Sequence, residues 1–229
     1  MPVYKDQHVI ESWKRIASAW TQIIQSQQIE SRAIATNQAI IDAVLSKQPK
    51  TLLDIGCGEG WLSRALTQQG IDCLGIDAIA ELIQHASQQE GRYQIISYEA
   101  LDQFNFNEQF DVLVCNFSLL GKQSVENVFA NAKRLLSPSG WLIVQTIHPA
   151  TIQSIANNQD SWQIETWDIL DNNSPQAIPW YARSMDSWET LFKQAGFKQL
   201  EISNIKHPNS QALLSVIFSG SIYDKLETD

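Results

Sequence analysis

Apolar side chains recur at helical spacing in the first 48 residues. In the first segment they follow one another at steps of three and four, at Trp13, Ile16, Trp20, Ile23 and Ile24. A second amphipathic segment runs from Ala33 to Leu45 and stops before Pro49. Both patterns place their apolar residues on one face of a helix, so the pattern predicts two helices ahead of the rest of the chain.

From residue 51 the pattern changes to short apolar runs that alternate with amphipathic segments. Strands are predicted over 51–55, 71–76, 93–98, 110–115 and 141–147. Helices are predicted over 60–69, 79–89 and about 124–136, and Ser137-Pro-Ser-Gly140 has the chemistry of a helix stop followed by a turn. Such alternation is typical of a parallel sheet that helices cover on both faces.

The alternation breaks after the fifth strand. Residues 149–183 hold three of the eight tryptophans but little regular periodicity. A helix is predicted from residue 186 or 187 to 195, and two apolar runs follow over 198–205 and 212–219. Because a short turn separates these runs, they predict an antiparallel pair. We therefore expect a five-stranded parallel body with a terminal antiparallel hairpin.

The first predicted strand ends in three alternating glycines, within Thr51-Leu-Leu-Asp-Ile-Gly-Cys-Gly-Glu-Gly60. Glycines here let the backbone turn sharply and leave no Cβ between the loop and a ligand. Asp77 ends the second predicted strand, roughly 20 residues after the loop, where a nucleotide-binding βαβ unit places its ribose-binding carboxylate. Asp77 could also cap the helix that follows it, and the two roles are compatible.

Charge narrows the class of ligand. The chain of 229 residues has 16 Lys and Arg against 25 Asp and Glu, a formal net charge of −9, and no Lys/Arg-rich run. A nucleic-acid binder needs a positive stripe to displace counterions from phosphates, so we expect a small or uncharged substrate and no nucleic acid. With 44% hydrophobic residues the chain is long enough to bury a full core as one domain.

Cysteine usage and the N-terminal residues indicate a cytoplasmic protein. Cys57, Cys73 and Cys115 lie in or beside predicted strands without metal-type spacing, as buried thiols in a reducing compartment do. The N-terminal residues lack the pattern of a signal peptide, and no apolar run approaches the roughly 18 residues of a membrane span.

Five segments together resemble the class I S-adenosylmethionine-dependent methyltransferases, over roughly residues 30–220. They are Leu53-Asp-Ile-Gly-Cys-Gly-Glu-Gly60, Asp77, Tyr98-Glu-Ala-Leu101, Phe110-Asp-Val-Leu-Val-Cys-Asn-Phe117 and Leu135-Leu-Ser-Pro-Ser-Gly-Trp-Leu-Ile-Val144. The chain looks most similar to the methyltransferase-domain group that includes quinone-biosynthesis and other small-molecule enzymes. Its Asn116-Phe-Ser-Leu segment departs from the motif of enzymes that methylate bases or glutamine.

The resemblance implies a doubly wound α/β fold, Rossmann-like, with a mostly parallel seven-stranded sheet in the order 3-2-1-4-5-7-6. Residues 1–48 would form an N-terminal helical cap. Residues 49–229 would form the S-adenosyl-L-methionine-binding domain, with a lid insert at about 149–183.

The resemblance also implies a set of cofactor-binding residues: Arg32, Asp54, Gly56, Cys57, Gly58, Asp77, Ala78, Glu99, Ala100, Asn116 and Phe117. Asp77 would accept hydrogen bonds from both ribose hydroxyls, and Glu99 with the Ala100 main chain would hold the adenine. Asp54 would hold the loop and accommodate the cofactor ammonium group, while Arg32 would reach its carboxylate. Simpler readings stay open: a solvent-facing carboxylate for Glu99, a turn-forming Asn116 and a surface Arg32.

On the substrate side, His148 ends the fifth strand, and a histidine that titrates near neutrality can remove a proton from a nucleophile. It could instead satisfy backbone groups ahead of Pro149. Trp180, Tyr181 and Arg183 are candidate substrate contacts in the lid. Aromatic residues such as those of the first helix and of the insert are more often packing residues than a binding site.

The sequence thus favours methyl transfer by direct displacement to a small-molecule acceptor, a reaction that needs placement rather than a catalytic triad or a metal. Two alternatives stay open. A nicotinamide-dependent oxidoreductase would use Asp77 equally well, although its glycines run G-x-G-x-x-G and those here run G-x-G-x-G. A non-catalytic relative would bind the cofactor, or nothing, and act through a partner. The sequence does not identify the acceptor or the oligomeric state.

Overall fold

The computed structural model describes residues 4–152, 159–167 and 176–223. Within them, seven strands form one sheet in the order β3-β2-β1-β4-β5-β9-β8. Their bounds are β1 (Thr51–Ile55), β2 (Asp72–Asp77), β3 (Arg92–Ile95), β4 (Phe110–Asn116), β5 (Leu136–Ile147), β8 (Gln199–Lys206) and β9 (Leu213–Ser221). The strands β1 to β5 run parallel, and β9 is antiparallel to both β5 and β8. The predicted parallel body and terminal hairpin are confirmed.

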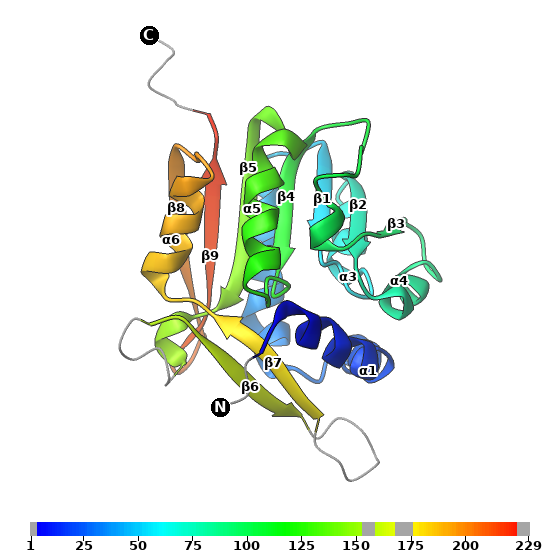
Figure 1. The fold of residues 1–229 in the computed structure, drawn as a ribbon, viewed down its shortest axis with the longest axis vertical. Coiled ribbons are helices and arrows are strands. Elements are labelled where there is room, and N and C mark those ends of the chain that lie inside the picture. The colour runs from blue at the N-terminus through cyan, green and yellow to red at the C-terminus, as the bar shows by residue number, and fades with distance from the viewer. Residues whose placement is uncertain (1–3, 153–158, 168–175, 224–229) are drawn as a thin grey trace.

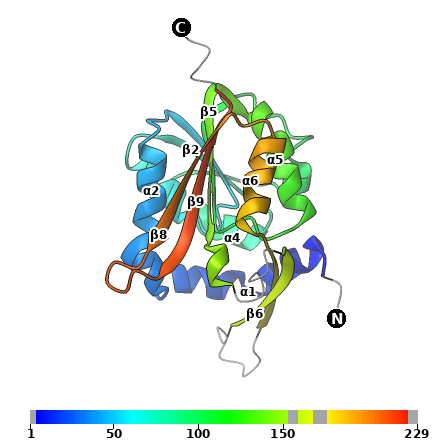
Figure 2. The same cartoon turned by 90° about the vertical axis from the view of Figure 1, so that its left-hand side faces the viewer.

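Helices cover both faces of the sheet, as Figure 2 shows. They are α2 (Asn37–Leu45), α3 (Trp61–Thr67), α4 (Ala80–Ala86), α5 (Gln123–Leu135) and α6 (Met185–Gln194). Strand β1 shows why both faces are filled. Leu52 packs in a cluster with α2 and α3, whereas Leu53 and Ile55 point to the opposite face and pack in a cluster with α5 and α6. Successive side chains of a strand alternate between faces, so a strand buried on both sides reads as a continuous apolar run.

The predicted turn at residues 137–140 is wrong. Helix α5 does end at Leu135, but β5 begins at the next residue and runs through this segment. The register between β4 and β5 shifts there, so the segment forms a bulge. The Asp111 carboxylate accepts from Ser137 Oγ at 3.1 Å and from the Lys50 N–H at 2.8 Å, which holds the extended segment to the sheet. A bulge accommodates proline because its ladder bond is already lost.

Two further strands, which the sequence analysis did not predict, form an antiparallel hairpin of their own. These are β6 (Ser161–Trp167) and β7 (Gln176–Ala182). The hairpin projects beyond the ends of the main strands (Figure 1). The Tyr181 N–H donates to the Leu120 carbonyl at 2.7 Å, which ties β7 to the loop after β4. Residues 153–158 and 168–175 of the predicted lid lie outside the described residues.

Helix α1 (Asp6–Gln25) lies across the edge of the sheet at which the parallel strands end (Figure 1). Its buried Ala17 packs against Ile79 and Leu82, which follow β2, and the helix also contacts β7. A π-helical turn, η1 (Arg32–Thr36), then leads into α2. The two predicted N-terminal helices are therefore present, and α1 covers the edge where an open α/β sheet binds its ligands.

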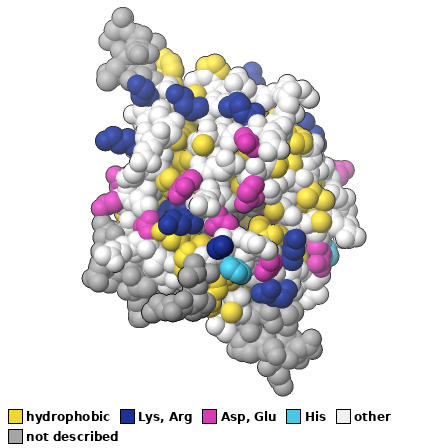
Figure 3. Space-filling model, viewed as in Figure 1, with side chains coloured by type: hydrophobic (Ala, Val, Ile, Leu, Met, Phe, Trp, Pro, Cys, Tyr) yellow, Lys and Arg dark blue, Asp and Glu magenta, His cyan; other side chains and the backbone are white. Residues whose placement is uncertain are grey.

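Acidic and basic side chains are interspersed over the face of the molecule in Figure 3. Among the described residues, no helix combines the length and the apolarity that a membrane crossing requires. The three cysteines are buried and free, as predicted.

Candidate active site

The glycine loop between β1 and α3 turns through left-handed backbone conformations. Gly56, Gly58 and Gly60 have φ of +77°, +57° and +84°, which L-residues with a Cβ rarely adopt. The N–H groups of Gly56 and Cys57 donate to the Ile76 carbonyl at 2.8 and 3.0 Å, so the loop is fixed to the end of β2. A Cβ on Gly56 would lie 2.4 Å from the Ser118 Cβ, whereas a Cβ on Gly58 would meet no atom within 4 Å. Gly58 therefore presents bare main chain to open space.

Asp77, at the end of β2, joins this loop to the next one. Its Oδ2 accepts from the Gly58 N–H at 3.0 Å, and its Oδ1 accepts from the Ile79 N–H at 2.8 Å. Burial raises the pKa of the carboxyl, and the backbone N–H groups that bond to it oppose that rise. A carboxylate has about four acceptor positions, so each oxygen can take a further hydrogen bond from a ligand.

A cleft opens beside these two loops, with about 880 Å³ free of protein atoms when its open mouth is included. The strand ends form its floor and α1 its roof. Of the predicted cofactor residues, nine line it: Arg32, Gly56, Cys57, Gly58, Asp77, Ala78, Glu99, Asn116 and Phe117. Two do not, Asp54 and Ala100.

Asp54 lies beneath the loop rather than in the cleft. Its side chain is 1% exposed, and its Oδ2 accepts from Ser63 Oγ at 2.8 Å. Burial raises the pKa of this carboxyl to about 7, while the bond from Ser63 opposes that rise. The contact joins the end of β1 to α3, so the structure gives Asp54 the loop-holding part of its predicted role.

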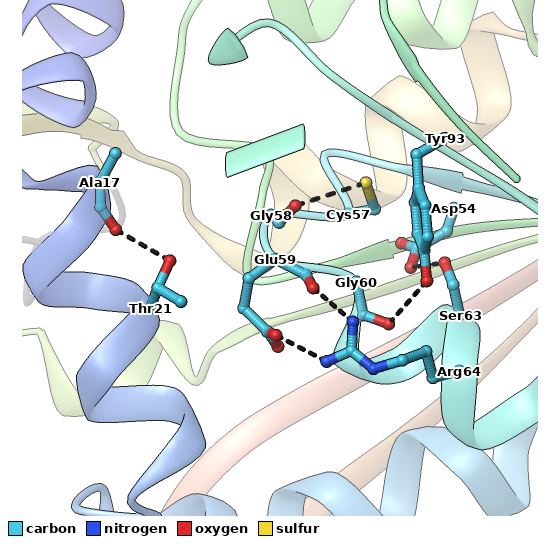
Figure 4. Close-up of polar contacts among 10 residues, drawn as sticks. All are labelled: Ala17, Thr21, Asp54, Cys57, Gly58, Glu59, Gly60, Ser63, Arg64 and Tyr93. Carbon is cyan, nitrogen blue, oxygen red and sulfur yellow. Dashed lines mark hydrogen bonds and ion pairs between the residues drawn. The ribbon is translucent and has the colours of Figure 1, made fainter. Parts of the chain in front are cut away.

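Glu59 is buried on the α3 side of the cleft, and α1 passes opposite it (Figure 4). Its Oε2 pairs with Arg64 Nη2 at 2.6 Å, and Arg64 Nη1 donates to the Glu59 carbonyl at 2.5 Å. Glu59 Oε1 is buried and has no hydrogen-bond partner within the described chain. The ion pair rigidifies the loop beyond Gly58.

Arg32 lines the cleft among three aromatic rings. Its guanidinium carbon is 5.2 Å from the ring centre of Trp20, 5.8 Å from that of Trp61 and 5.5 Å from that of Phe117. Burial lowers its pKa to about 10, still far above neutrality, and the charge of Glu59 opposes that shift. The guanidinium group makes no hydrogen bond to the described residues, so its fork of donors is available to an anion.

The loops after β3 and β4 complete the floor. Within η2 (Tyr98–Ala100), the buried Tyr98 hydroxyl donates to the Ser118 carbonyl at 3.1 Å, and burial raises its pKa. Glu99 lines the cleft beside it. Asn116 ends β4, is 9% exposed, and has a buried Oδ1 with no hydrogen-bond partner in the described chain. A buried acceptor without a partner is costly, so it marks a position where a ligand donor fits.

A family model described as a methyltransferase domain matches residues 28–202, most of the chain. The chain belongs to this methyltransferase family. The ubiquinone biosynthesis O-methyltransferase of Pseudomonas entomophila (strain L48) is 36% identical over 114 residues. That match covers 47% of this chain and 49% of the relative, so the chain spans about half the length of the curated relatives it matches.

Solved structures show the same methyltransferase fold. An S-adenosylmethionine-dependent methyltransferase from Clostridium acetobutylicum aligns over 93% of this chain and 99% of its own, with a TM-score of 0.63 and 14% identity. The 1,6-didemethyltoxoflavin-N1-methyltransferase of Burkholderia thailandensis, solved with its acceptor and S-adenosylhomocysteine, aligns over 98% and 93%, with a TM-score of 0.64 and 15% identity. The class I methyltransferase fold that the sequence implied is confirmed.

The structure does not bring His148 to the cleft. Its Nδ1 accepts from the Ala150 N–H at 3.2 Å, so Nε2 carries the proton and faces Asn204 Oδ1 at 3.1 Å. The ring is 6% exposed and caps the short turn η3 (Pro149–Thr151). With both nitrogens engaged, the structure gives His148 the backbone-satisfying role that the sequence analysis left open.

The three predicted substrate residues also lie outside the cleft lining. Trp180 is buried in a cluster with Ala182 and neighbours. Arg183 is buried and donates to the Gly121 and Lys122 carbonyls at 2.9 and 2.8 Å, while Tyr181 packs on Trp162 with ring centres 5.4 Å apart. These residues support the loop between β4 and α5. The side chain of Trp167 lies outside the described residues.

Sequence reasoning missed several residues that line the cleft: Asp6, Val9, Ile10, Leu82, Leu120, Gly121 and Ser124. The apolar stripe of α1 was visible in the sequence, and Trp13 and Trp20 on it do line the cleft. No local signal shows where that stripe docks, because its apolar partners Ile79 and Leu82 come much later in the chain.

Gly56→Ala and Gly58→Ala separate a crowded turn from an open one. Both alanines must adopt positive φ, at a cost of about 1–2 kcal/mol. Of the two, only the Cβ of Gly56→Ala collides with protein atoms. We therefore expect the free energy of unfolding to fall by at least about 1–3 kcal/mol more in Gly56→Ala than in Gly58→Ala. Urea unfolding of the ligand-free proteins measures the difference, and equal losses would contradict the geometry.

Asp54→Asn tests the buried carboxyl. Because the folded-state pKa is about 7 and the unfolded value is 3.8, the protonated form is favoured on folding. The contribution of this carboxyl to the free energy of unfolding should therefore be fully present below about pH 4. It should decline towards pH 7, by roughly 1.4 kcal/mol for each unit of pKa difference. Asp54→Asn should lack this decline in urea unfolding from pH 4 to 8. Parallel pH curves for the two proteins would show that Asp54 ionises normally.

Proposed function

We propose that this protein transfers a methyl group from S-adenosylmethionine to a small-molecule acceptor by direct displacement. The observation that carries the proposal is the pairing of Gly58 with Asp77. Gly58, which has no Cβ, faces open space, and its N–H donates to the half-buried Asp77 carboxylate, which retains acceptor positions.

Asp77 would hold the ribose in this proposal. The two ribose hydroxyls are donors, and a carboxylate shared between them forms charge-assisted hydrogen bonds. Ala78 follows directly and lines the cleft, so the adenine would lie between its main chain and Glu99. Glu99 would accept from the adenine amino group.

Arg32 and Asn116 would hold the amino-acid end. This end carries a carboxylate and an ammonium group, which need a cation and an acceptor. The Arg32 guanidinium, with no protein anion bonded to it, suits the carboxylate. The buried Oδ1 of Asn116, which lacks a protein donor, suits the ammonium group. Neither role is available to Asp54, whose carboxyl lies beneath the loop.

When bound, S-adenosylmethionine would supply a methyl group already activated by the positive sulfur. The acceptor lone pair would form the new bond as the carbon–sulfur bond breaks, and the acceptor proton would pass to solvent. Among the described residues that line the cleft there is no histidine or lysine, and the Tyr98 hydroxyl proton is engaged by the Ser118 carbonyl. Of the carboxylates that line the cleft, Glu59 pairs with Arg64, and Asp6 accepts from backbone N–H groups of α5. Asp77 and Glu99 would bind the cofactor, so the protein would contribute mainly placement and exclusion of water.

The cleft walls suit an acceptor that is largely apolar. Five apolar side chains contribute to its lining: Val9, Ile10 and Trp13 of α1, Leu82 of α4, and Leu120 after β4. The cleft carries four carboxylates but one guanidinium, which the cofactor would occupy. Because the protein has a net charge of −9, a small neutral acceptor fits better than nucleic acid. We expect the protein to act in the cytoplasm.

Cofactor binding tests the proposal directly. S-adenosylhomocysteine should bind by isothermal calorimetry, and NAD should not. Asp77→Ala should weaken binding about 10- to 100-fold, because hydrogen bonds to a charged group contribute about 1.5–3 kcal/mol. Asp72→Asn, on the exposed first residue of the same strand, is the control and should bind as the wild type does. Binding of NAD alone would favour the oxidoreductase alternative.

Arg32→Gln should discriminate between ligands with and without the amino-acid end. We expect about tenfold weaker binding of S-adenosylhomocysteine and unchanged binding of 5′-methylthioadenosine, which lacks the carboxylate. Arg15→Gln, at an exposed position of α1, should change neither. An equal loss for both ligands would mean that Arg32 supports the cleft without contacting the carboxylate.

A further inference from the structure

Helix α5 begins without a cap from its own segment. Lys122 occupies the N-cap position and makes no side-chain cap bond, so the N–H groups of the first turn need other acceptors. They find them on α1. Asp6 Oδ1 accepts from the Lys122 N–H at 2.7 Å, and Asp6 Oδ2 accepts from the Ser124 N–H at 2.6 Å. A carboxylate at a helix N-terminus is also favoured by the helix dipole.

The loop that receives Asp6 is shaped for this approach. A Cβ on Gly121 would lie 2.1 Å from Ser124 Oγ and 3.0 Å from the Asp6 Cγ, so a side chain there would displace the Ser124 hydroxyl and crowd the Asp6 carboxylate. Arg183 holds the carbonyls of Gly121 and Lys122 from the opposite side. Asp6 thus binds to a loop that is independently fixed.

The same helix roofs the cleft. Asp6, Val9, Ile10, Trp13 and Trp20 of α1 all line it, from its first turn to its fifth. Further along α1, Ala17 packs on Ile79 and Leu82, and the exposed Ser18 donates to Glu81. At the first turn of α1, Asp6 makes the polar contacts to the rest of the described chain through its two bonds to the start of α5.

We propose that Asp6 is a positioning residue that closes α1 over the cofactor cleft by capping α5. The inference rests on the proposed function for the identity of the ligand in the cleft, but not for the closure itself. Breaking the two Asp6 bonds frees the first turns of α1 and opens the part of the cleft that these turns cover. A ligand beneath α1 then leaves faster. Asp6 acts through the helix and needs no contact with the reacting atoms.

The dissociation rate of S-adenosylhomocysteine from the full chain measures this role. In stopped-flow displacement by excess 5′-methylthioadenosine, Asp6→Ala should raise the rate about tenfold. Asp6→Asn keeps one acceptor oxygen for one of the two N–H groups, so its rate should lie between those of the wild type and Asp6→Ala. Glu11→Ala removes an exposed carboxylate of α1 that bonds only within the helix, to Gln7, and should leave the rate unchanged. A lower melting temperature for Asp6→Ala with an unchanged rate would overturn the proposal.

Hydrogen exchange in the ligand-free protein tests the closure without a cofactor. The amides of α1 should exchange about tenfold faster in Asp6→Ala than in the wild type and in Glu11→Ala, while those of the central strands stay unchanged. Equal exchange in α1 would overturn the proposal whatever the ligand. If exchange rises but S-adenosylhomocysteine binds none of the proteins, the role of Asp6 in closing α1 is supported and the proposed function fails.

Discussion

The hydrogen bond between the Asp77 carboxylate and the Gly58 N–H is the contact on which the site depends. It joins the loops after β1 and β2, two adjacent parallel strands, at the edge of the sheet where ligands bind. The loop can present its N–H only because Gly58 takes a left-handed conformation, and the carboxylate is held towards it by the Ile79 N–H. One short-range contact therefore fixes both the shape of the loop and the direction of the acceptor.

Burial and bonding partners explain why three acidic residues near this contact, Asp54, Glu59 and Asp77, have different roles. Asp54 is enclosed and its pKa is raised to about 7, so it acts as a structural link to Ser63. Glu59 is neutralised by Arg64 and stiffens the loop. Burial raises the pKa of Asp77 as well, but its backbone donors favour the charged form, which suits it to accept hydrogen bonds from neutral hydroxyl groups. Three carboxylates within one loop region thus serve three different purposes, and burial and partner decide which.

Local patterns predicted the core of the fold and the floor of the site. The bounds of β1 and the position of Asp77 follow from an apolar run that ends in glycine and acidic residues, because those signals act over a few residues. Contacts between distant segments could not be predicted in this way. Asp6 bonds to groups 116 and 118 residues away, and His148 is turned from the cleft by Asn204 on a different strand. The β6–β7 hairpin lacks clear alternation, and Pro138 suggested a turn where a bulge and Asp111 keep the chain extended.

A crystal structure of the protein with S-adenosylhomocysteine tests the central claim most directly. We expect both ribose hydroxyls to lie about 2.5–3.0 Å from the Asp77 oxygens, with the Gly58 N–H still bonded to Asp77. The carboxylate of the ligand should bind to Arg32. A ligand seated elsewhere, or an Asp77 side chain turned away from the sugar, would contradict it.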